Sequence, residues 1–118
     1  MIKYSPLNYK EINADNKNIF GYIGFDTDKK TECGKCVASI DGYTMKILSL
    51  DFDGDAETAE GFIRSTLNYG ANRNAYIAYY CAQNGIDVAK TLGFTENNDG
   101  ILYGEIPELL KGSCCKGK

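Results

Sequence analysis

The sequence contains no histidine. A general base would therefore have to be Asp, Glu, Tyr, Cys or a bound water. The chain also lacks a glycine-rich phosphate loop, the paired histidines of zinc proteases and the nucleophile elbow of serine hydrolases. No residue of the sequence stands out as catalytic.

Basic charge and long apolar runs are also scarce. Thirteen Lys and Arg face sixteen Asp and Glu, which gives a formal net charge of -3. Phosphate-backbone binding needs clustered Lys and Arg, so we expect no nucleic-acid partner. The longest apolar runs, near Ile47–Leu50 and Ala75–Cys81, fall far short of the roughly 20 residues that span a membrane.

The first six residues, Met1–Pro6, lack the apolar stretch of a signal peptide. We therefore expect a cytoplasmic protein whose five cysteines are reduced thiols. Apolar residues make up 43% of the 118 residues and charged residues 25%, as is usual for a globular protein. This length predicts one domain, residues 1–110, followed by a flexible tail, residues 111–118, rich in Cys and Lys.

The first half of the chain favours β-strands. Met1–Tyr4, Ile19–Phe25, Lys35–Ile40 and Tyr43–Phe52 are rich in aromatic and β-branched residues. The Asp41-Gly42 pair between the last two runs predicts a tight hairpin turn. These strands are expected to form an antiparallel meander.

The second half alternates helices and strands. One apolar stripe predicts a helix that starts after Asp53-Gly54-Asp55 and stops near Gly70 or Asn72. The stripe consists of Ala59, Phe62, Ile63, Thr66 and Leu67. A strand, a short helix and a closing hairpin follow, over residues 75–81, 84–92 and 94–106. The crossover from strand through helix to strand requires a parallel pair, so the predicted fold is α+β, a mixed sheet with two helices.

Three segments, in this order and spacing, resemble the GNAT superfamily of N-acetyltransferases. KILSLDF is similar to the central strand of that family, AETAEGFIRSTLNYGANRNA to its cofactor-binding helix, and AKTLGF to its closing LGF signature. The likeness runs from Ile19 to Ile106. Only about eighteen residues precede Ile19, too few for the helix pair that the family has between its first two strands. The chain thus looks like a shortened, divergent member whose acceptor cleft is open or completed by a second chain, and we expect a homodimer.

The resemblance implies an acyl-CoA-dependent N-acyltransferase that moves an acetyl group to an amine. It places the pyrophosphate of acetyl-CoA on backbone amides of the loop Gly54–Ala59. It also pairs the pantetheine arm with Leu50–Phe52 as a sheet edge would. The implied cofactor-binding residues are Leu50, Asp51, Phe52, Gly54, Asp55, Ala56, Glu57, Thr58, Ala59 and Asn84.

The chain departs from the family pattern at two of these places. Gly54 stands where the family has Arg or Gln, and Glu57 stands where it has its first glycine. Acidic side chains gather here, and carboxylates at a helix N-terminus occupy the site that a pyrophosphate needs. Ala89 stands where the family often has the tyrosine that protonates the departing thiolate. A non-catalytic binding or dimerisation module with this fold is therefore the alternative.

The cysteines suggest a third hypothesis, a thiol or metal protein. Cys33 and Cys36 form a CxxC pair, and Cys114 and Cys115 lie in the tail. Four thiolates could hold zinc, although the usual partner of one CxxC is a second CxxC. The alternative is that Cys33 and Cys36 lie in a loop and have no such role, and that Cys81 is a core residue at the end of a buried strand.

Overall fold

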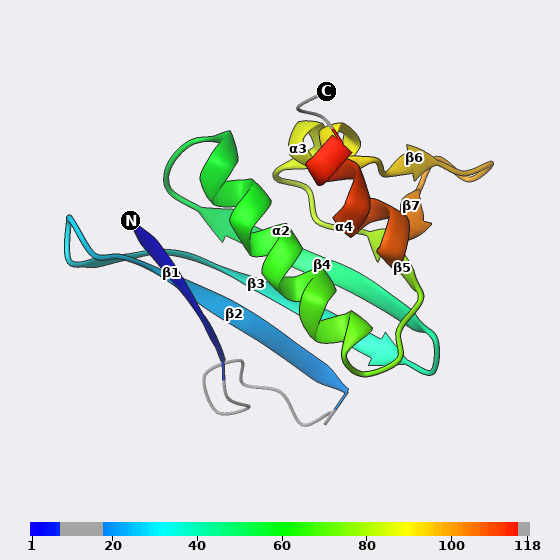
Figure 1. The fold of residues 1–118 in the computed structure, drawn as a ribbon, viewed down its shortest axis with the longest axis horizontal. Helices are drawn as coiled ribbons and strands as arrows, with labels where there is room; N and C mark the ends of the chain where they lie inside the picture. Colours follow the sequence, from blue (N-terminus) through cyan, green and yellow to red (C-terminus); the bar gives the residue numbers. More distant parts are fainter. Residues whose placement is uncertain (8–17, 116–118) are drawn as a thin grey trace.

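A computed structural model describes residues 1–7 and 18–115 of the chain, with side chains through Lys111. Seven strands form one twisted sheet in the order β1-β2-β3-β4-β5-β7-β6 (Figure 1). Three helices accompany it in the described residues, so the fold is α+β, as predicted. The elements are β1 (Ile2–Pro6), β2 (Ile19–Asp26), β3 (Thr31–Asp41), β4 (Thr44–Phe52), α2 (Ala56–Ala71), β5 (Ile77–Tyr80), α3 (Ile86–Leu92), β6 (Thr95–Glu96), β7 (Leu102–Glu105) and α4 (Ile106–Cys115).

The sheet is mixed, with one parallel pair. β1 through β4 form the predicted antiparallel meander. β4 then pairs with β5 in parallel, because α2 carries the chain back across the sheet before β5 begins. β5, β7 and β6 complete the sheet with antiparallel pairs, which confirms the predicted closing hairpin.

Helix α2 covers the middle of one sheet face, and α4 lies on the same side (Figure 1). The predicted apolar stripe of α2 is buried, and Phe62, Ile63 and Leu67 have no exposed surface. The predicted start is also confirmed, since Asp55 caps the helix and Asn72 ends it. A single core thus forms between this helix and the sheet.

Tyr4 connects strand β1 to α2. The Tyr4 ring meets the edge of Phe62 with ring centroids 4.9 Å apart, and the Tyr4 hydroxyl donates to the Thr58 carbonyl at 2.9 Å. Gly61 leaves room for this ring, because a Cβ there would lie 2.1 Å from the Tyr4 oxygen. The first strand therefore holds the beginning of the helix in place.

Two features were missed from the sequence. Helix α4 was not anticipated, and it takes in residues 111–115 of the segment assigned to a flexible tail; the last three residues lie outside the described part of the chain. Strand β3 begins at Thr31, so the CxxC pair lies in a strand and the idea of loop thiols was wrong.

The connection between β1 and β2 comprises residues 7–18, of which 8–17 lie outside the described residues. That length is too short for the two helices that the resemblance places there. Among the described residues, no helix has both the length and the apolar character needed to cross a bilayer.

Candidate functional site

Strands β4 and β5 stay together for only four residue pairs and then part. The parallel register runs from Thr44 opposite Ile77 to Ile47 opposite Tyr80. β4 continues to Phe52, toward the start of α2, still paired with β3 on its other side (Figure 1). Leu48 is an extra residue in β4 at this point, because Val37 faces Ser49 while Ala38 faces Ile47. Such a bulge bends its strand, and it sits where the two strands separate.

The parting of the strands leaves a groove of about 330 Å³. We call it the β4 groove; its lining residues are Leu48, Ser49, Leu50, Asp51, Cys81, Gln83 and Asn84. Two hydrogen bonds span it. The Cys81 amide donates to the Ile47 carbonyl at 2.8 Å, and the Asn84 side-chain amide donates to the Leu50 carbonyl at 3.2 Å.

A second hollow, of about 640 Å³, continues from the β4 groove to the start of α2. We call it the helix hollow. It shares Gln83 and Asn84 with the groove, and its other lining residues are Phe52, Gly54, Asp55, Ala56 and residues 85–88. The two together form a channel from the strand gap to a helix N-terminus. A long ligand with an anionic end matches such a channel in shape.

Among the first amides of α2, that of Thr58 is already used by the chain itself. The Asp55 carboxylate accepts from the Thr58 amide at 3.1 Å and from the Thr58 hydroxyl at 3.2 Å. These hydrogen bonds from Thr58 lower the pKa of Asp55 below its ordinary value. An anionic ligand would therefore meet a carboxylate at the point where a helix start usually attracts it.

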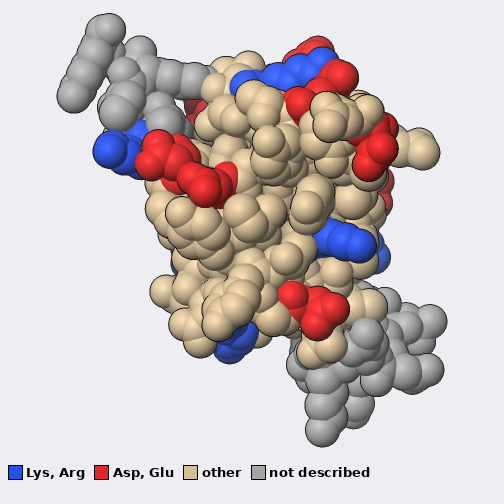
Figure 2. All heavy atoms as spheres, turned by 90° about the vertical axis from the view of Figure 1, so that its right-hand side faces the viewer, with Lys and Arg blue, Asp and Glu red and all other residues tan. Residues whose placement is uncertain are grey.

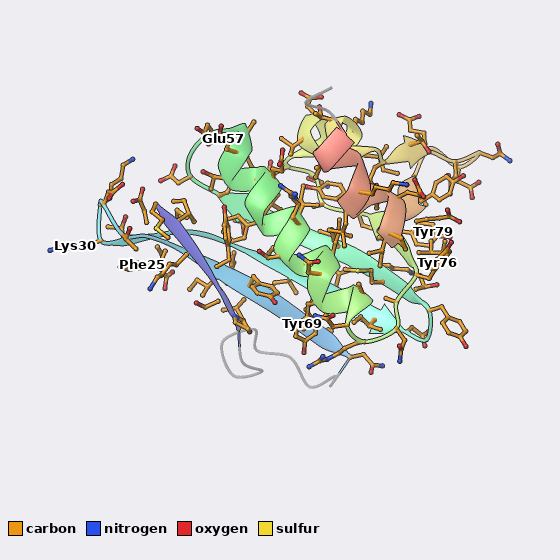
Figure 3. The ribbon with its side chains drawn as sticks, viewed as in Figure 1. Phe25, Lys30, Glu57, Tyr69, Tyr76 and Tyr79 are labelled. Carbon is orange, nitrogen blue, oxygen red and sulfur yellow. The ribbon has the colours of Figure 1, made fainter. Side chains whose placement is uncertain are left out.

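Gly54 lets the chain turn into the helix at this point. Its φ of 137° lies where side chains are rarely accommodated. A Cβ there would also lie 2.9 Å from the Thr58 hydroxyl. Glu57, in the first turn of α2, is exposed at the end of the helix opposite Tyr69 (Figure 3).

The ten cofactor-binding residues expected from the sequence fall into three groups. Leu50, Asp51 and Asn84 line the β4 groove, and Phe52, Gly54, Asp55 and Ala56 line the helix hollow, as does Asn84. Thr58 is mostly buried beneath the cap, whereas Ala59 has no exposed surface and faces the core. Glu57 is exposed on the first turn of α2 but lines neither space, and Thr58 and Ala59 line neither space as well, so these three are not placed to touch a ligand there.

Three tyrosines in and next to β5 are poor substitutes for the proton donor that the resemblance places at Ala89. Tyr80 is 3% exposed, its hydroxyl donates to the Asn84 carbonyl, and burial raises its pKa. The charge of nearby Glu105 raises the pKa of Tyr76, which is exposed. Tyr79 faces the side of the sheet away from α2. Ala89 itself is fully buried.

Cys81 lines the β4 groove, a position that was not predicted from the sequence. It was expected in the core, and that was wrong, because the side chain is exposed. It follows Tyr80 directly, and successive residues of a strand point to opposite faces. Since Tyr80 is buried, this alternation was the signal that could have placed Cys81 outside.

The CxxC pair is a core feature. Cys33 is 6% exposed and Cys36 is fully buried. A register irregularity in β3 leaves Cys33 without a partner in β2, and both thiols point toward α2, where Cys36 accepts from the Thr66 hydroxyl at 3.3 Å. The described residues contain no cluster of three or more metal-ligating side chains, and Cys114 and Cys115 lie beyond the described side chains. The structure therefore does not support the zinc site.

Comparison with known proteins supplies a fold. No protein-family model and no curated protein matches the sequence. Solved structures do match. The ribosomal-protein-S18-alanine N-acetyltransferase from Escherichia coli superposes with a TM-score of 0.69 at 11% identity, over 90% of this chain and 94% of that one.

Two further solved structures agree. An N-acetyltransferase from Staphylococcus aureus Mu50 gives a TM-score of 0.64 at 12% identity, over 91% and 99% of the two chains. The PaiA N-acetyltransferase from Thermoplasma acidophilum, solved in complex with coenzyme A, gives 0.63 at 11% identity, over 82% and 65%. The chain therefore has the fold of the GNAT superfamily of N-acetyltransferases.

Proposed function

We propose that this protein binds an acyl-CoA along the β4 groove and transfers the acyl group to an amine. The observation that carries the proposal is the parting of β4 and β5 beside a helix N-terminus, with Gln83 and Asn84 lining both spaces. One structural neighbour is itself a complex with coenzyme A. A bound acyl-CoA would supply the activated acyl group as a thioester: the amine nitrogen would form the new amide bond, the thioester C–S bond would break, and coenzyme A would leave as its thiol with the proton that the amine loses.

The chain fits the two ends of such a ligand unequally. Beyond Ile47, the β4 edge has no strand partner among the described residues, so an extended arm can lie against it. At the other end, the backbone near Gly54 and Ala56 faces the helix hollow, but Asp55 brings a negative charge there. The groove therefore favours binding and the cap opposes it, which predicts weak affinity for the diphosphate end.

Cys81 offers a direct test of occupancy. Of the three cysteines whose side chains are described, Cys33 and Cys36 are buried and Cys81 is exposed in the groove. In a C114S/C115S variant, iodoacetamide should alkylate Cys81 alone in the folded protein, with the site identified by mass spectrometry. Saturating acetyl-CoA should slow this reaction about tenfold, because the ligand covers the thiol, whereas the same concentration of ATP should not. An unchanged alkylation rate would remove the proposed binding mode.

The acidic cap offers a second test. Asp55→Asn keeps a hydrogen-bond acceptor at the cap and removes its charge. Coenzyme A should bind this variant about threefold more tightly or better, measured by isothermal titration, because one repulsion with the diphosphate is lost. Asp26→Asn is the matched control, since Asp26 also accepts from backbone amides, those of Asp28 and Lys29, but lies at the end of β2, outside the groove and the helix hollow.

A non-catalytic binding module is the second candidate, favoured by the acidic cap and by Ala89. It predicts coenzyme A binding without acetylated product from any amine, which mass spectrometry would detect.

We also propose a homodimer, because α2 and α4 cover one face of the sheet and leave the other open in the described part of the chain (Figure 1). A monomeric mass by light scattering at working concentrations would contradict the dimer.

A further inference from the structure

A further hollow adjoins the β4 groove on the sheet face away from α2. We call it the outer hollow; it measures about 340 Å³ and is lined by Lys46, Tyr79, Cys81, Asn97, Asp99 and Ile101. Cys81 lines both spaces. The outer hollow therefore opens at the point where β4 and β5 part, on the side opposite the core.

Strand alternation places Lys46 and Tyr79 on this outer face. Met45 and Ile47 are fully buried on the α2 side, so Lys46 between them points outward. Lys46 is opposite Tyr79, and Tyr79 is opposite Tyr103, with ring centroids 6.2 Å apart. The cation thus stands beside an aromatic row that fixes one wall of the outer hollow.

Asp99 enters from the turn between β6 and β7. The Asn97 side-chain oxygen accepts from the Asp99 amide at 2.9 Å and from the Ile101 amide at 3.0 Å. These two hydrogen bonds hold the turn in shape and use the Asn97 oxygen internally. The Asp99 side chain is left exposed at the wall opposite the strands.

The two opposite charges of the outer hollow do not pair with each other. Within the described residues, neither the Lys46 ammonium nor the Asp99 carboxylate has a hydrogen-bonding or ion-pair partner. Figure 2 shows the side of the molecule where β5, β6 and β7 lie, and acidic and basic side chains are scattered there around a broad uncharged area. A ligand that carries both signs would satisfy both groups at once.

We propose that the outer hollow binds the acceptor, and that this acceptor is a free α-amino acid. Lys46 binds its carboxylate, and Asp99 attracts its ammonium group, while Tyr79 and Asn97 flank the side chain. Residues two apart on a strand are separated by about 6.6 Å, so a small molecule held at Tyr79 lies within reach of the groove at Cys81. The inference rests on the proposed function, because the groove supplies the acyl group.

The test separates binding of the acceptor from turnover. Saturation-transfer NMR with coenzyme A present would compare an equimolar mixture of the twenty L-amino acids with the mixture of their carboxamides. The amides keep the amine and lose the negative charge. At least one amino acid should give a signal that its amide lacks, with an affinity difference of about tenfold or more, as expected for a charge-assisted hydrogen bond.

Two variants assign the preference to its residues. Lys46→Met should abolish the preference for the carboxylate, and Asp99→Asn should weaken binding of amino acid and amide alike. Lys35→Met is the matched control, because Lys35 is also an exposed lysine of the sheet but lies outside the outer hollow. Lys35→Met should leave the preference for the carboxylate unchanged. In Lys46→Met, acetyl-CoA should still protect Cys81 from alkylation as it does in the wild type.

Three outcomes overturn the inference: no amino acid binds, amides bind equally well, or Lys46→Met changes nothing. If acetyl-CoA still protects Cys81 in any of these cases, the acyl-CoA groove stands and only the acceptor is wrong. If protection fails while amino acids bind through Lys46, the proposed function fails and the outer hollow is an amino-acid site of another kind.

Discussion

The two halves of β4 differ although they belong to one strand. From Thr44 to Ile47, β4 has a neighbour on both sides and buries Met45 and Ile47 completely. From Leu48 to Phe52, it keeps only β3, and its other edge faces the β4 groove. One extra residue, Leu48, separates a stretch paired on both sides from a stretch with one open edge, and Leu50 in the second stretch is also buried in the core. Stability and binding can therefore be changed separately on a single strand.

The largest effect is expected from truncating one residue on each side of this boundary. Ile47→Ala should lower the free energy of unfolding by about 2–5 kcal/mol, because it leaves a cavity in the core. Leu48→Ala, with a side chain 39% exposed, should cost less than about 1 kcal/mol. Urea denaturation measures both. Equal losses would mean that the bulge does not divide the strand energetically.

The pH dependence of stability extends this comparison to the buried and the exposed cysteines. Burial raises the pKa of Cys36, in the closed part of the sheet, to about 11, against the opposing hydrogen bond from Thr66. The unfolded chain releases this proton at a lower pH than the folded chain does. The stability that the protonated Cys36 thiol contributes is therefore fully present below the ordinary thiol pKa. As the pH rises from about 9 to 11, the free energy of unfolding falls by about 2–3 kcal/mol.

Chemical denaturation at pH 8, 9 and 10.5 would measure this slope in the wild type and in Cys36→Ala. The variant should lose the part of the slope that Cys36 causes. Cys81→Ala is the control from the open side, and it should keep the wild-type slope. If both variants keep that slope, the buried thiol is not its source.

A smaller effect is expected where β1 meets α2. Tyr4→Phe removes the hydrogen bond to the Thr58 carbonyl and keeps the ring against Phe62. Thermal or urea unfolding should show a loss of about 1 kcal/mol. Tyr43→Phe is a suitable control, because that side chain is 75% exposed. A loss equal to that of the control would show that the hydroxyl does not fasten the strand to the helix.

The smallest effect is expected on thermal stability at low pH, through the Asp55 cap at the start of α2. Asp55 has a lowered pKa, so the stability that it gives is present above its unfolded pKa and is lost as the pH falls through the folded value. The melting temperature of the wild type should therefore drop more between pH 6 and pH 3 than that of Asp55→Asn. The same drop in both proteins would indicate that the cap contributes nothing through its charge.

Local patterns predicted much of this fold. The apolar stripe from Ala59 to Leu67 predicted α2, and Asp53-Gly54-Asp55 marked its start because a carboxylate there can reach the first amides. Asp41-Gly42 marked the β3–β4 turn, and the polar segment around Asn97 marked the closing hairpin. Each of these signals lies within a few residues of the feature that it predicts.

Features that depend on distant contacts were beyond such reading. The burial of both Cys33 and Cys36 follows from an irregularity in the pairing of β3 with β2, which no local pattern reveals. The outer hollow joins Lys46 of one strand to Asp99 of a remote turn. Helix α4 did carry a local signal, since Pro107 fits the first turn of a helix, but the glycine and cysteines that follow it concealed the helix.

Asn84 ties the two walls of the β4 groove together. Its backbone carbonyl accepts from the Tyr80 hydroxyl, and its side chain donates to the Leu50 carbonyl at 3.2 Å. This hydrogen bond limits how far the walls can spread, and it occupies one of the two acceptor positions of the Leu50 oxygen. In the binding mode proposed above, a bulky acyl chain would have to find its space past Cys81, toward the outer hollow, so the size of the acyl group and the size of the acceptor would compete for one volume.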